Sequence, residues 1–503
     1  MRDSARAYHE ATAYDRRQMT GHSLDWGNQP EAFKTYPGFE SVPLPKEPHL
    51  PRCSLWDLAG EAWEPDPDIE IDMNGLAGIL LMSHAVTAKA RHGGTFFHYR
   101  SVASAGALYP FETYVAAFDV PGLDDGLYHH DIAGQNLELL RTGNALAELI
   151  PAVGMDMNPA PVLMFVLTAI FFRSSWKYRD RAYRYALLDT GHLAENLALA
   201  IRSERARFTL CRDFDDAAVN RVLGLDTARE VSLAVVSVWG KASGKRTGVG
   251  LSDPQTDLAR FSRVASREID YPLIGQAHAT TSGVETGPRA HIEMSGLLGP
   301  DLGEERPFSR PATMPGLITY PEAVLKRRSM RNFVPTEMSA DHLSALLSML
   351  CAKPLNSTVG EPEADNAVCV GFLAGNVEGL DPGFYMVHRE RQTICAAARG
   401  SMMDAMTHIC LDQAWLANCA VHFLFLGNLD AVESSYGPRG YRHAMMTAGR
   451  LGQRLYLGAT SMKLGCCGIG AYYDDEAARL LGLNAESKLL YLTAVGPIKK
   501  YHG

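Results

Sequence analysis

The chain has 503 residues, a length that suggests about three domains. Hydrophobic residues make up 46% of it and charged residues 21%, which excludes a disordered or fibrous protein. The 48 basic and 57 acidic residues give a net charge of -9, which argues against nucleic acid or anionic lipid as a partner.

The sequence pattern predicts a cytoplasmic protein without a membrane segment. The longest strongly apolar stretch, residues 160–172, is too short to cross a bilayer, and the first residues carry charges of both signs with no apolar run behind them. The nine cysteines include no C-x-x-C pair, so we expect reduced thiols and no metal site.

Strands and a long helix are expected in the first half of the chain. Residues 113–117 and 163–167 are runs of apolar and β-forming residues, which are typical of strands. From Ala186 to Ile201, leucine and isoleucine recur at helical spacing, which predicts a long buried helix. A sheet flanked by helices follows.

The chain also repeats itself. Tyr183–Gly191 reads YRYALLDTG, and Tyr441–Gly449, 258 positions later, reads YRHAMMTAG. Further matches keep the same order, such as Leu223–Leu225 with Leu481–Leu483, and Asp215-Asp216 with Asp474-Asp475. We therefore infer two copies of one domain.

The repeat divides the chain into four expected segments. These are an N-terminal extension (1–49), a first domain (50–240), a connector rich in Gly, Pro and Ser (241–317) and a second domain (318–503).

A run of small residues in the first copy is the strongest single motif. Residues 101–110 read SVASAGALYP. Small residues such as Ala105 and Gly106 let the backbone approach a flat ring, and the Ser104 hydroxyl can donate a hydrogen bond to it. A tight entry into the next strand would explain the glycine, but not the whole run.

A second motif, Lys177-Tyr178, stands just before the repeated helix, where the second copy has Ser435-Tyr436. A surface lysine beside a core-facing tyrosine is the alternative interpretation. His192, on the buried helix, is expected to be a satisfied polar residue rather than a catalyst.

Two motifs in the second copy are typical of binding sites, one for an anion and one for a flat ring. Residues 326–333 read KRRSMRNF, and the guanidinium groups of Arg327 and Arg331 with the Ser329 hydroxyl can hold a phosphate from alternate positions. A solvated basic patch is the alternative. Residues 464–470 read LGCCGIG, in which backbone amides can approach a ring; an ordinary Gly-rich turn is the alternative.

In type and order, these motifs resemble those of the nitroreductase-like flavoenzymes, and more closely the SagB-type dehydrogenases that act on ribosomal peptides. The resemblance implies an α+β fold of two tandem nitroreductase-like domains, each with a central, mainly antiparallel sheet flanked by helices. It also implies that the two copies pack as an intrachain pseudo-dimer, with FMN as the cofactor bound at the interface between them.

The resemblance assigns roles to individual residues. It implies that Lys177 and Tyr178 are catalytic. It implies that the following residues bind FMN: Arg327, Arg328, Ser329, Arg331, Ser104, Ala105, Gly106, Gly468, Ile469, Gly470 and Lys499. The first copy has residues 207–213 in place of the glycine segment, and the second copy has Lys353–Ser357 in place of the Ser104 segment, so one complete composite site is expected.

The function that the resemblance implies is FMN-dependent oxidation of azolines to azoles in a ribosomally made peptide. Flavin N5 would take the hydride while Lys177 or Tyr178 takes a proton. The expected partners are the peptide substrate and a cyclodehydratase. Two alternatives are an NAD(P)H-dependent reductase of nitroaromatics or quinones, and a non-catalytic protein that binds a peptide or a cyclodehydratase.

Overall fold

The structure is a computed structural model that describes residues 4–19, 21–60, 63–92, 95–154, 158–242, 244, 249–283, 292–316, 318–352 and 366–499. Residues 353–357, expected in place of the Ser104 segment, lie outside the described residues. No helix in the described part is both long and apolar enough to cross a membrane. All nine cysteines are free thiols.

The first half is built on a seven-stranded antiparallel sheet with the order β1-β6-β5-β4-β7-β9-β8. Its strands are β1 (Glu40–Pro43), β4 (Phe111–Ala117), β5 (Gly126–Asp131), β6 (Asn136–Thr142), β7 (Leu163–Ile170), β8 (Arg207–Cys211) and β9 (Glu230–Trp239). Alternate residues of β4 point to opposite faces, so Val115 joins the large central core and Tyr114 a smaller outer core.

The second half contains an equivalent seven-stranded antiparallel sheet, with the order β10-β13-β12-β11-β14-β16-β15. Its strands are β10 (Glu305–Pro307), β11 (Cys369–Ala374), β12 (Gly383–His388), β13 (Thr393–Arg399), β14 (Val421–Asn428), β15 (Gly465–Ile469) and β16 (Ser487–Gly496). Each strand has a counterpart at the same place in the first sheet, which confirms the expected pair of α+β domains. A separate hairpin, β2 (Val86–His92) and β3 (Thr95–Arg100), belongs to the first half.

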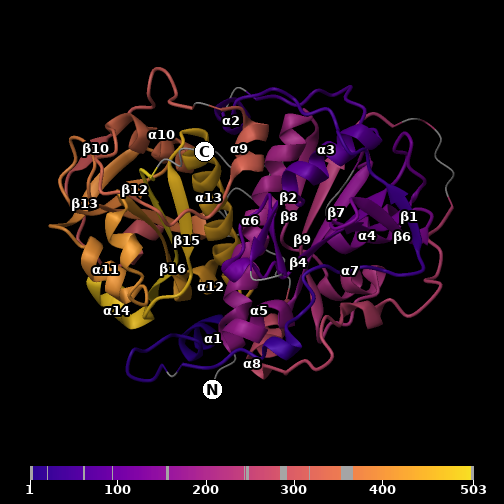
Figure 1. The fold of residues 1–503 in the computed structure, drawn as a ribbon, viewed down its shortest axis with the longest axis horizontal. Coiled ribbons are helices and arrows are strands. Elements are labelled where there is room, and N and C mark those ends of the chain that lie inside the picture. Colours follow the sequence, from indigo (N-terminus) through magenta and orange to yellow (C-terminus); the bar gives the residue numbers. More distant parts are fainter. Residues whose placement is uncertain are drawn as a thin grey trace.

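Helices cover the sheets and form the junction between the halves (Figure 1). They are α1 (Ala5–Ala11), α2 (Leu55–Ala59), α3 (Met73–Ser83), α4 (Leu146–Val153), α5 (Phe171–Tyr178), α6 (Ala182–Ser203), α7 (Asp216–Leu223), α8 (Pro272–Thr280), α9 (Tyr320–Lys326), α10 (Ala340–Cys351), α11 (Met403–Ile409), α12 (Leu429–Tyr436), α13 (Gly440–Ser461) and α14 (Asp474–Leu480).

The long helices α6 and α13 lie side by side at the centre of the molecule, and every residue of α6 is buried. They touch at two glycines that the repeat had already paired, Gly191 and Gly449. A methyl group on Gly191 would lie 2.1 Å from the Met446 carbonyl oxygen, and one on Gly449 would lie 2.1 Å from the Leu188 carbonyl oxygen. Only glycine permits this close backbone contact, so the repeated motif contains the two residues that the interface between the halves requires.

Buried ion pairs lock each end of this helix pair. Asp474 accepts hydrogen bonds from Arg181 and Arg184, each at 2.7 Å. At the pseudo-equivalent place, Asp216 accepts from Arg439 (2.6 Å) and Arg442 (2.8 Å). The structural counterpart of Asp474 is therefore Asp216 and not Asp215, one residue away from the pairing expected by sequence.

The segments outside the expected domains are repeated too. In the N-terminal extension, the Thr12 hydroxyl accepts from Arg184 Nε at 3.0 Å; in the connector, the Thr281 hydroxyl accepts from Arg442 Nε at 2.9 Å. Strands β1 and β10 lie in the same two segments and hold equivalent sheet edges. Each half is thus completed by its own N-terminal arm, and the first arm reaches across to α14 of the other half, where Tyr14 bridges to Tyr473.

Candidate functional site

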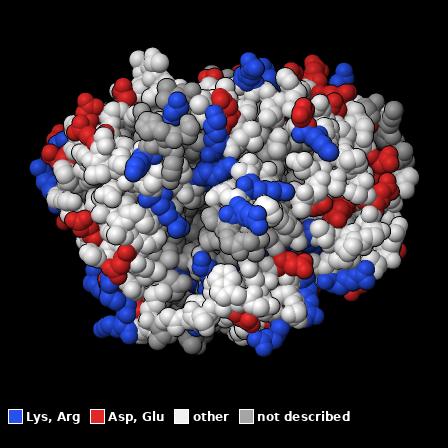
Figure 2. All heavy atoms as spheres, in the orientation of Figure 1, with Lys and Arg blue, Asp and Glu red and all other residues white. Residues whose placement is uncertain are grey.

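Two adjoining cavities lie at the junction of the halves. The outer cavity, of about 370 Å³, is lined by Phe97, Tyr99, Ala103, Ser104, Gly106, Ala107, Tyr109, Lys177, Arg327, Ser329 and Arg331. The smaller inner cavity, of about 70 Å³, is lined by Ala103, Ser104, Ala105, Gly106, Tyr185, Leu188, Asp189, His192, Ser329, Arg331, Tyr456, Cys467, Gly468, Gly470 and Tyr491. Figure 2 shows Lys and Arg side chains gathered along the junction between the halves, although the chain is acidic overall. Both halves contribute to each cavity.

The Ser104 loop is held in a tight conformation by one buried carboxylate. Gly106 has a φ of 62°, and the next residues include Ala107 and Tyr109 at φ values of 55° and 47°. Asp189 accepts from the Ser104 hydroxyl at 2.6 Å and from the Ala105 N–H at 3.1 Å. Burial raises the pKa of Asp189 to about 7. The loop is thus fixed against α6 with its small residues facing the cavity.

Lys177 and Tyr178 lie at the end of α5 and meet this loop. A methyl group on Gly106 would lie 2.7 Å from the Tyr178 hydroxyl and 3.1 Å from Lys177 Nζ. Burial, with a smaller contribution from the nearby Arg331 charge, lowers the pKa of Lys177. Burial, and next the Asp189 charge, raise the pKa of Tyr178. The Lys177 amine therefore loses its proton more easily than an exposed lysine does, and Tyr178 stays a phenol at neutral pH.

Some side chains of the basic motif line the outer cavity, and others pack against neighbouring residues. Arg327, 3% exposed, donates from Nε to the Ser101 carbonyl (3.0 Å) and from Nη2 to the Arg100 carbonyl (2.8 Å), while its buried Nη1 has no partner within the described residues. Arg331 and Ser329 also line the outer cavity. Arg328 lines neither cavity and packs over the Tyr99 ring at 4.9 Å. An anion in the outer cavity would meet an unpaired donor that is already buried.

The glycine segment is part of β15 and lies against aromatic rings. A methyl group on Gly470 would lie 2.5 Å from the Tyr185 ring, and one on Gly468 would overlap the Tyr491 hydroxyl. The Gly468 N–H donates to the Tyr456 hydroxyl at 2.7 Å. Gly468 and Gly470 line the inner cavity, whereas the Ile469 side chain packs into the core.

Lys499 is exposed and lines neither cavity. Its backbone N–H donates to the Asn332 carbonyl at 3.0 Å, beside Arg331.

Side chains fill the pseudo-equivalent place in the other half. Leu210 in β8 corresponds to Gly468 in β15, and Arg212, just after β8, corresponds to Gly470. Arg212 is 1% exposed and donates to the Thr447 hydroxyl at 2.9 Å. Thr447 is the counterpart of Asp189, so the arginine spans the space that the glycine leaves open in the other half.

Sequence reasoning missed several residues of the site. Asp189 lies inside the repeated motif, and its replacement by Thr447 in the other copy was the signal that could have identified it. Tyr185 lies in the same repeated motif, whereas the rings of Tyr456 and Tyr491 carry no local motif, because they enter the site from a distant helix and strand.

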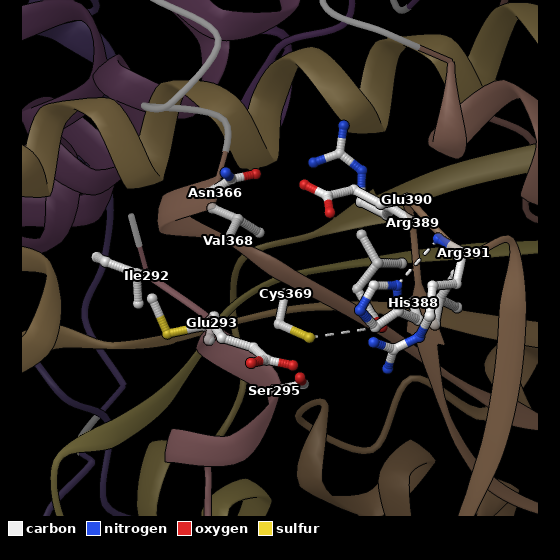
Figure 3. Close-up of a pocket in the computed structure, with 13 residues that line it drawn as sticks. Ile292, Glu293, Ser295, Asn366, Val368, Cys369, His388, Arg389, Glu390 and Arg391 are labelled. Carbon is white, nitrogen blue, oxygen red and sulfur yellow. Dashed lines mark hydrogen bonds between the residues drawn. The ribbon is translucent and has the colours of Figure 1, made fainter. Parts of the chain in front are cut away.

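A separate cavity of about 250 Å³ lies in the second half, between the start of β11 and the turn that follows β12 (Figure 3). It is lined by Glu293, His388 and Arg391, among others, and by none of the predicted site residues. Most of the predicted residues therefore line the junction cavities, and none of them lines this pocket.

The Nitroreductase family profile matches residues 81–241 and 372–497, one segment in each half and more than half of the chain. The chain belongs to the nitroreductase family. A crystal structure of a nitroreductase-like protein from Anabaena variabilis superposes with a TM-score of 0.78 and 27% identity, covering 98% of this chain and 99% of that one. The tandem arrangement of this nitroreductase-family protein is thus shared over the full length.

Two curated proteins are similar to parts of the chain. A Methanocaldococcus jannaschii protein named as a nitroreductase, MJ1384, is 26% identical over 176 residues, which is 34% of this chain and 89% of its own. The Microcin B17-processing protein McbC of Escherichia coli is 29% identical over 147 residues, which is 28% of this chain and 54% of its own. The expected similarity to SagB-like dehydrogenases is confirmed by McbC and by the two family segments.

Proposed function

We propose that this nitroreductase-family protein is an FMN-dependent dehydrogenase that oxidises azolines to azoles in a ribosomally made peptide. The observation that carries the proposal is the position of Lys177, whose amine faces Gly106 and the Arg331 charge in a cavity built by both halves. The similarity to McbC, a protein named for processing microcin B17, supports a peptide as the substrate.

The residues at the junction fit FMN. The orphaned Nη1 of Arg327 and the side chains of Ser329 and Arg331 would hold the phosphate or an electronegative ring edge. The Ser104 loop and the two cavity-facing glycines leave flat surfaces that a side chain would close. FMN bound there would supply the hydride acceptor.

Lys177 is the proposed general base. Oxidation of an azoline removes a hydride from one ring carbon and a proton from its neighbour, so a side chain on the substrate side must accept the proton. The lowered pKa of Lys177 makes its proton easier to lose, and the neutral amine can take the substrate proton at Nζ. Tyr178, whose pKa is raised, remains a phenol and can donate a hydrogen bond that orients the ring.

Turnover of an azoline-bearing peptide by Lys177→Met and Tyr178→Phe tests the proposal. Lys177→Met is expected to slow the loss of two hydrogens, followed by mass spectrometry, by about 10²- to 10⁴-fold, the usual effect of removing a general base. Flavin content should stay unchanged. Lys326→Met is the matched control, because Lys326 is 60% exposed and pairs with Glu322 outside the cavity.

Full activity of Lys177→Met would refute the base assignment. A wild-type protein that reduces nitroaromatics with NADPH and leaves every azoline peptide unchanged would replace the proposal with the reductase alternative.

The same proposal requires one flavin per chain, because Arg212 and its neighbours fill the second place. Absorbance of released flavin against protein concentration is expected to give a ratio near one. A ratio near two would contradict the single composite site.

A further inference from the structure

A chain of buried polar side chains crosses the junction and ends at the inner cavity. His192 Nδ1 lies 2.8 Å from Gln453 Oε1, and Gln453 Nε2 donates to Asn196 Oδ1 at 2.7 Å. At the other side, His192 Nε2 lies 3.0 Å from the Tyr491 hydroxyl. None of the four side chains is more than 7% exposed, and His192 and Tyr491 line the inner cavity. We call these four residues the polar chain.

Backbone carbonyls at one end fix the direction of every hydrogen bond in the polar chain. Asn196 Nδ2 donates to the carbonyl oxygens of Ser83 (3.3 Å) and Ser101 (3.2 Å), which can only accept. The amide oxygen of Asn196 must therefore face Gln453 and accept from its Nε2. Gln453 then has only its oxygen left for His192, so His192 carries its proton on Nδ1.

The position of the proton on His192 determines whether the Tyr491 hydroxyl donates or accepts a hydrogen bond. A neutral imidazole protonated on Nδ1 has a bare Nε2, which accepts the hydroxyl proton of Tyr491. Burial, opposed by the hydrogen bond to the Gln453 oxygen, lowers the pKa of His192 to about 4, so the ring is neutral near pH 7. Burial raises the pKa of Tyr491, which stays a phenol. The Tyr491 oxygen is left with lone pairs and no proton to offer the cavity.

The other half lacks the polar chain. The counterparts of His192, Asn196, Gln453 and Tyr491 are Arg450, Arg454, Glu195 and Ala234. There Glu195 accepts from Arg450 at 3.0 Å and from Arg454 at 2.6 Å. An ion cluster has thus replaced the neutral chain in the half whose cavity is filled by Arg212, which ties the neutral chain to the open site.

We propose that the polar chain is a positioning device that makes the Tyr491 oxygen a hydrogen-bond acceptor for an N–H of the flavin ring. The proposal rests on the proposed flavin function. His192, Gln453 and Asn196 act through Tyr491 and do not themselves contact the ring. Oxidised flavin offers the N–H at N3, and reduced flavin offers a second N–H at N5.

The direction of the polar chain is tested first, without reference to flavin. Nitrogen NMR of histidine-labelled protein, with His192→Gln to assign the signals, is expected to show His192 neutral and protonated on Nδ1 near pH 7. A ring protonated on Nε2, or on both nitrogens, would overturn the proposal even if the protein proves to be a flavoenzyme. Conversely, absence of flavin binding would remove the proposed function and leave the measured direction intact.

Recognition of the ring is tested with Tyr491→Phe. Loss of one neutral hydrogen bond is expected to weaken FMN binding by the apoprotein roughly 2- to 10-fold if the partner is N3–H. If the partner is N5–H, the oxidised affinity stays the same and the midpoint potential of the bound flavin falls, because only the reduced form loses a contact.

The matched control is Tyr385→Phe, which removes a hydroxyl that donates to the Asp381 carbonyl in the same sheet, away from the cavity. Unchanged FMN affinity and unchanged potential in Tyr491→Phe, or tighter binding, would refute the acceptor role.

Discussion

Asp474→Asn separates the contribution of the junction to stability from its contribution to the site. Asp474 is 8% exposed and neutralises two buried arginines, Arg181 and Arg184, each at 2.7 Å. Asparagine keeps the shape but leaves two buried positive charges without a counterion. Removing one partner from a buried ion pair typically costs about 3–5 kcal/mol, a large share of a total stability of about 5–15 kcal/mol.

The matched variant is Asp216→Asn, which removes the equivalent carboxylate from Arg439 and Arg442. Both variants should therefore lose a similar free energy of unfolding, measured by urea denaturation followed by circular dichroism. Only Asp474→Asn should also lose flavin, because Arg181 Nη2 donates to the Gly470 carbonyl at 3.0 Å and so connects the Asp474 ion pairs to the glycine segment.

The ion pair also predicts a pH dependence. The arginine charges lower the pKa of Asp474 below its usual value, although burial opposes them. The carboxylate therefore stabilises the fold above about pH 4, the pKa of an unfolded aspartate, and this stabilisation is lost as the pH falls towards the folded value. Equal stability of wild type and Asp474→Asn near pH 7, or equal loss of flavin in both variants, would refute this reasoning.

Two further predictions concern the same region. Arg179 follows Tyr178 with a φ of 49° and a ψ of -136°, whereas its counterpart in the other half is Gly437. Arg179→Gly should raise the free energy of unfolding, measured by urea denaturation, by about 1 kcal/mol, because relief of about 1–3 kcal/mol of backbone strain exceeds the entropy cost of glycine. A lower stability of the variant would contradict this prediction. Asp189, with a pKa near 7, favours folding in its protonated form, so its contribution to stability falls as the pH rises from about 4 to about 7. Asp189→Asn should flatten the dependence of the unfolding free energy on pH over that same range, and an unchanged slope would refute the assignment.

The repeat in the sequence was sufficient to predict two copies of one mixed α and β domain. The offset that relates Tyr183–Gly191 to Tyr441–Gly449 already contains Gly191 and Gly449, the contact point of the central helices. The similarity of the two N-terminal arms was too sparse to detect, because it rests on a few buried residues such as Thr12 and Thr281. The arms were therefore expected to be an extension and a connector.

Side-chain direction explains the other differences at the site. The motif segments meet at the junction cavities, but a motif does not show which residues of an irregular turn or a strand face a cavity. Arg328 turns towards Tyr99, and Ile469 turns into the core between two glycines that face the cavity. The polar chain could not be predicted, because its members come from both halves and meet only after the helices have packed.

In the first half, the Arg212 side chain fills the place equivalent to the inner cavity, and this has a consequence for kinetics. An enzyme with two identical composite sites can couple them, so that one reacts while the other waits. A chain with a single open site in a two-fold scaffold has no second site to wait for. Its reduction should follow one exponential phase, and the activity of a partly loaded sample should rise in direct proportion to the cofactor it contains.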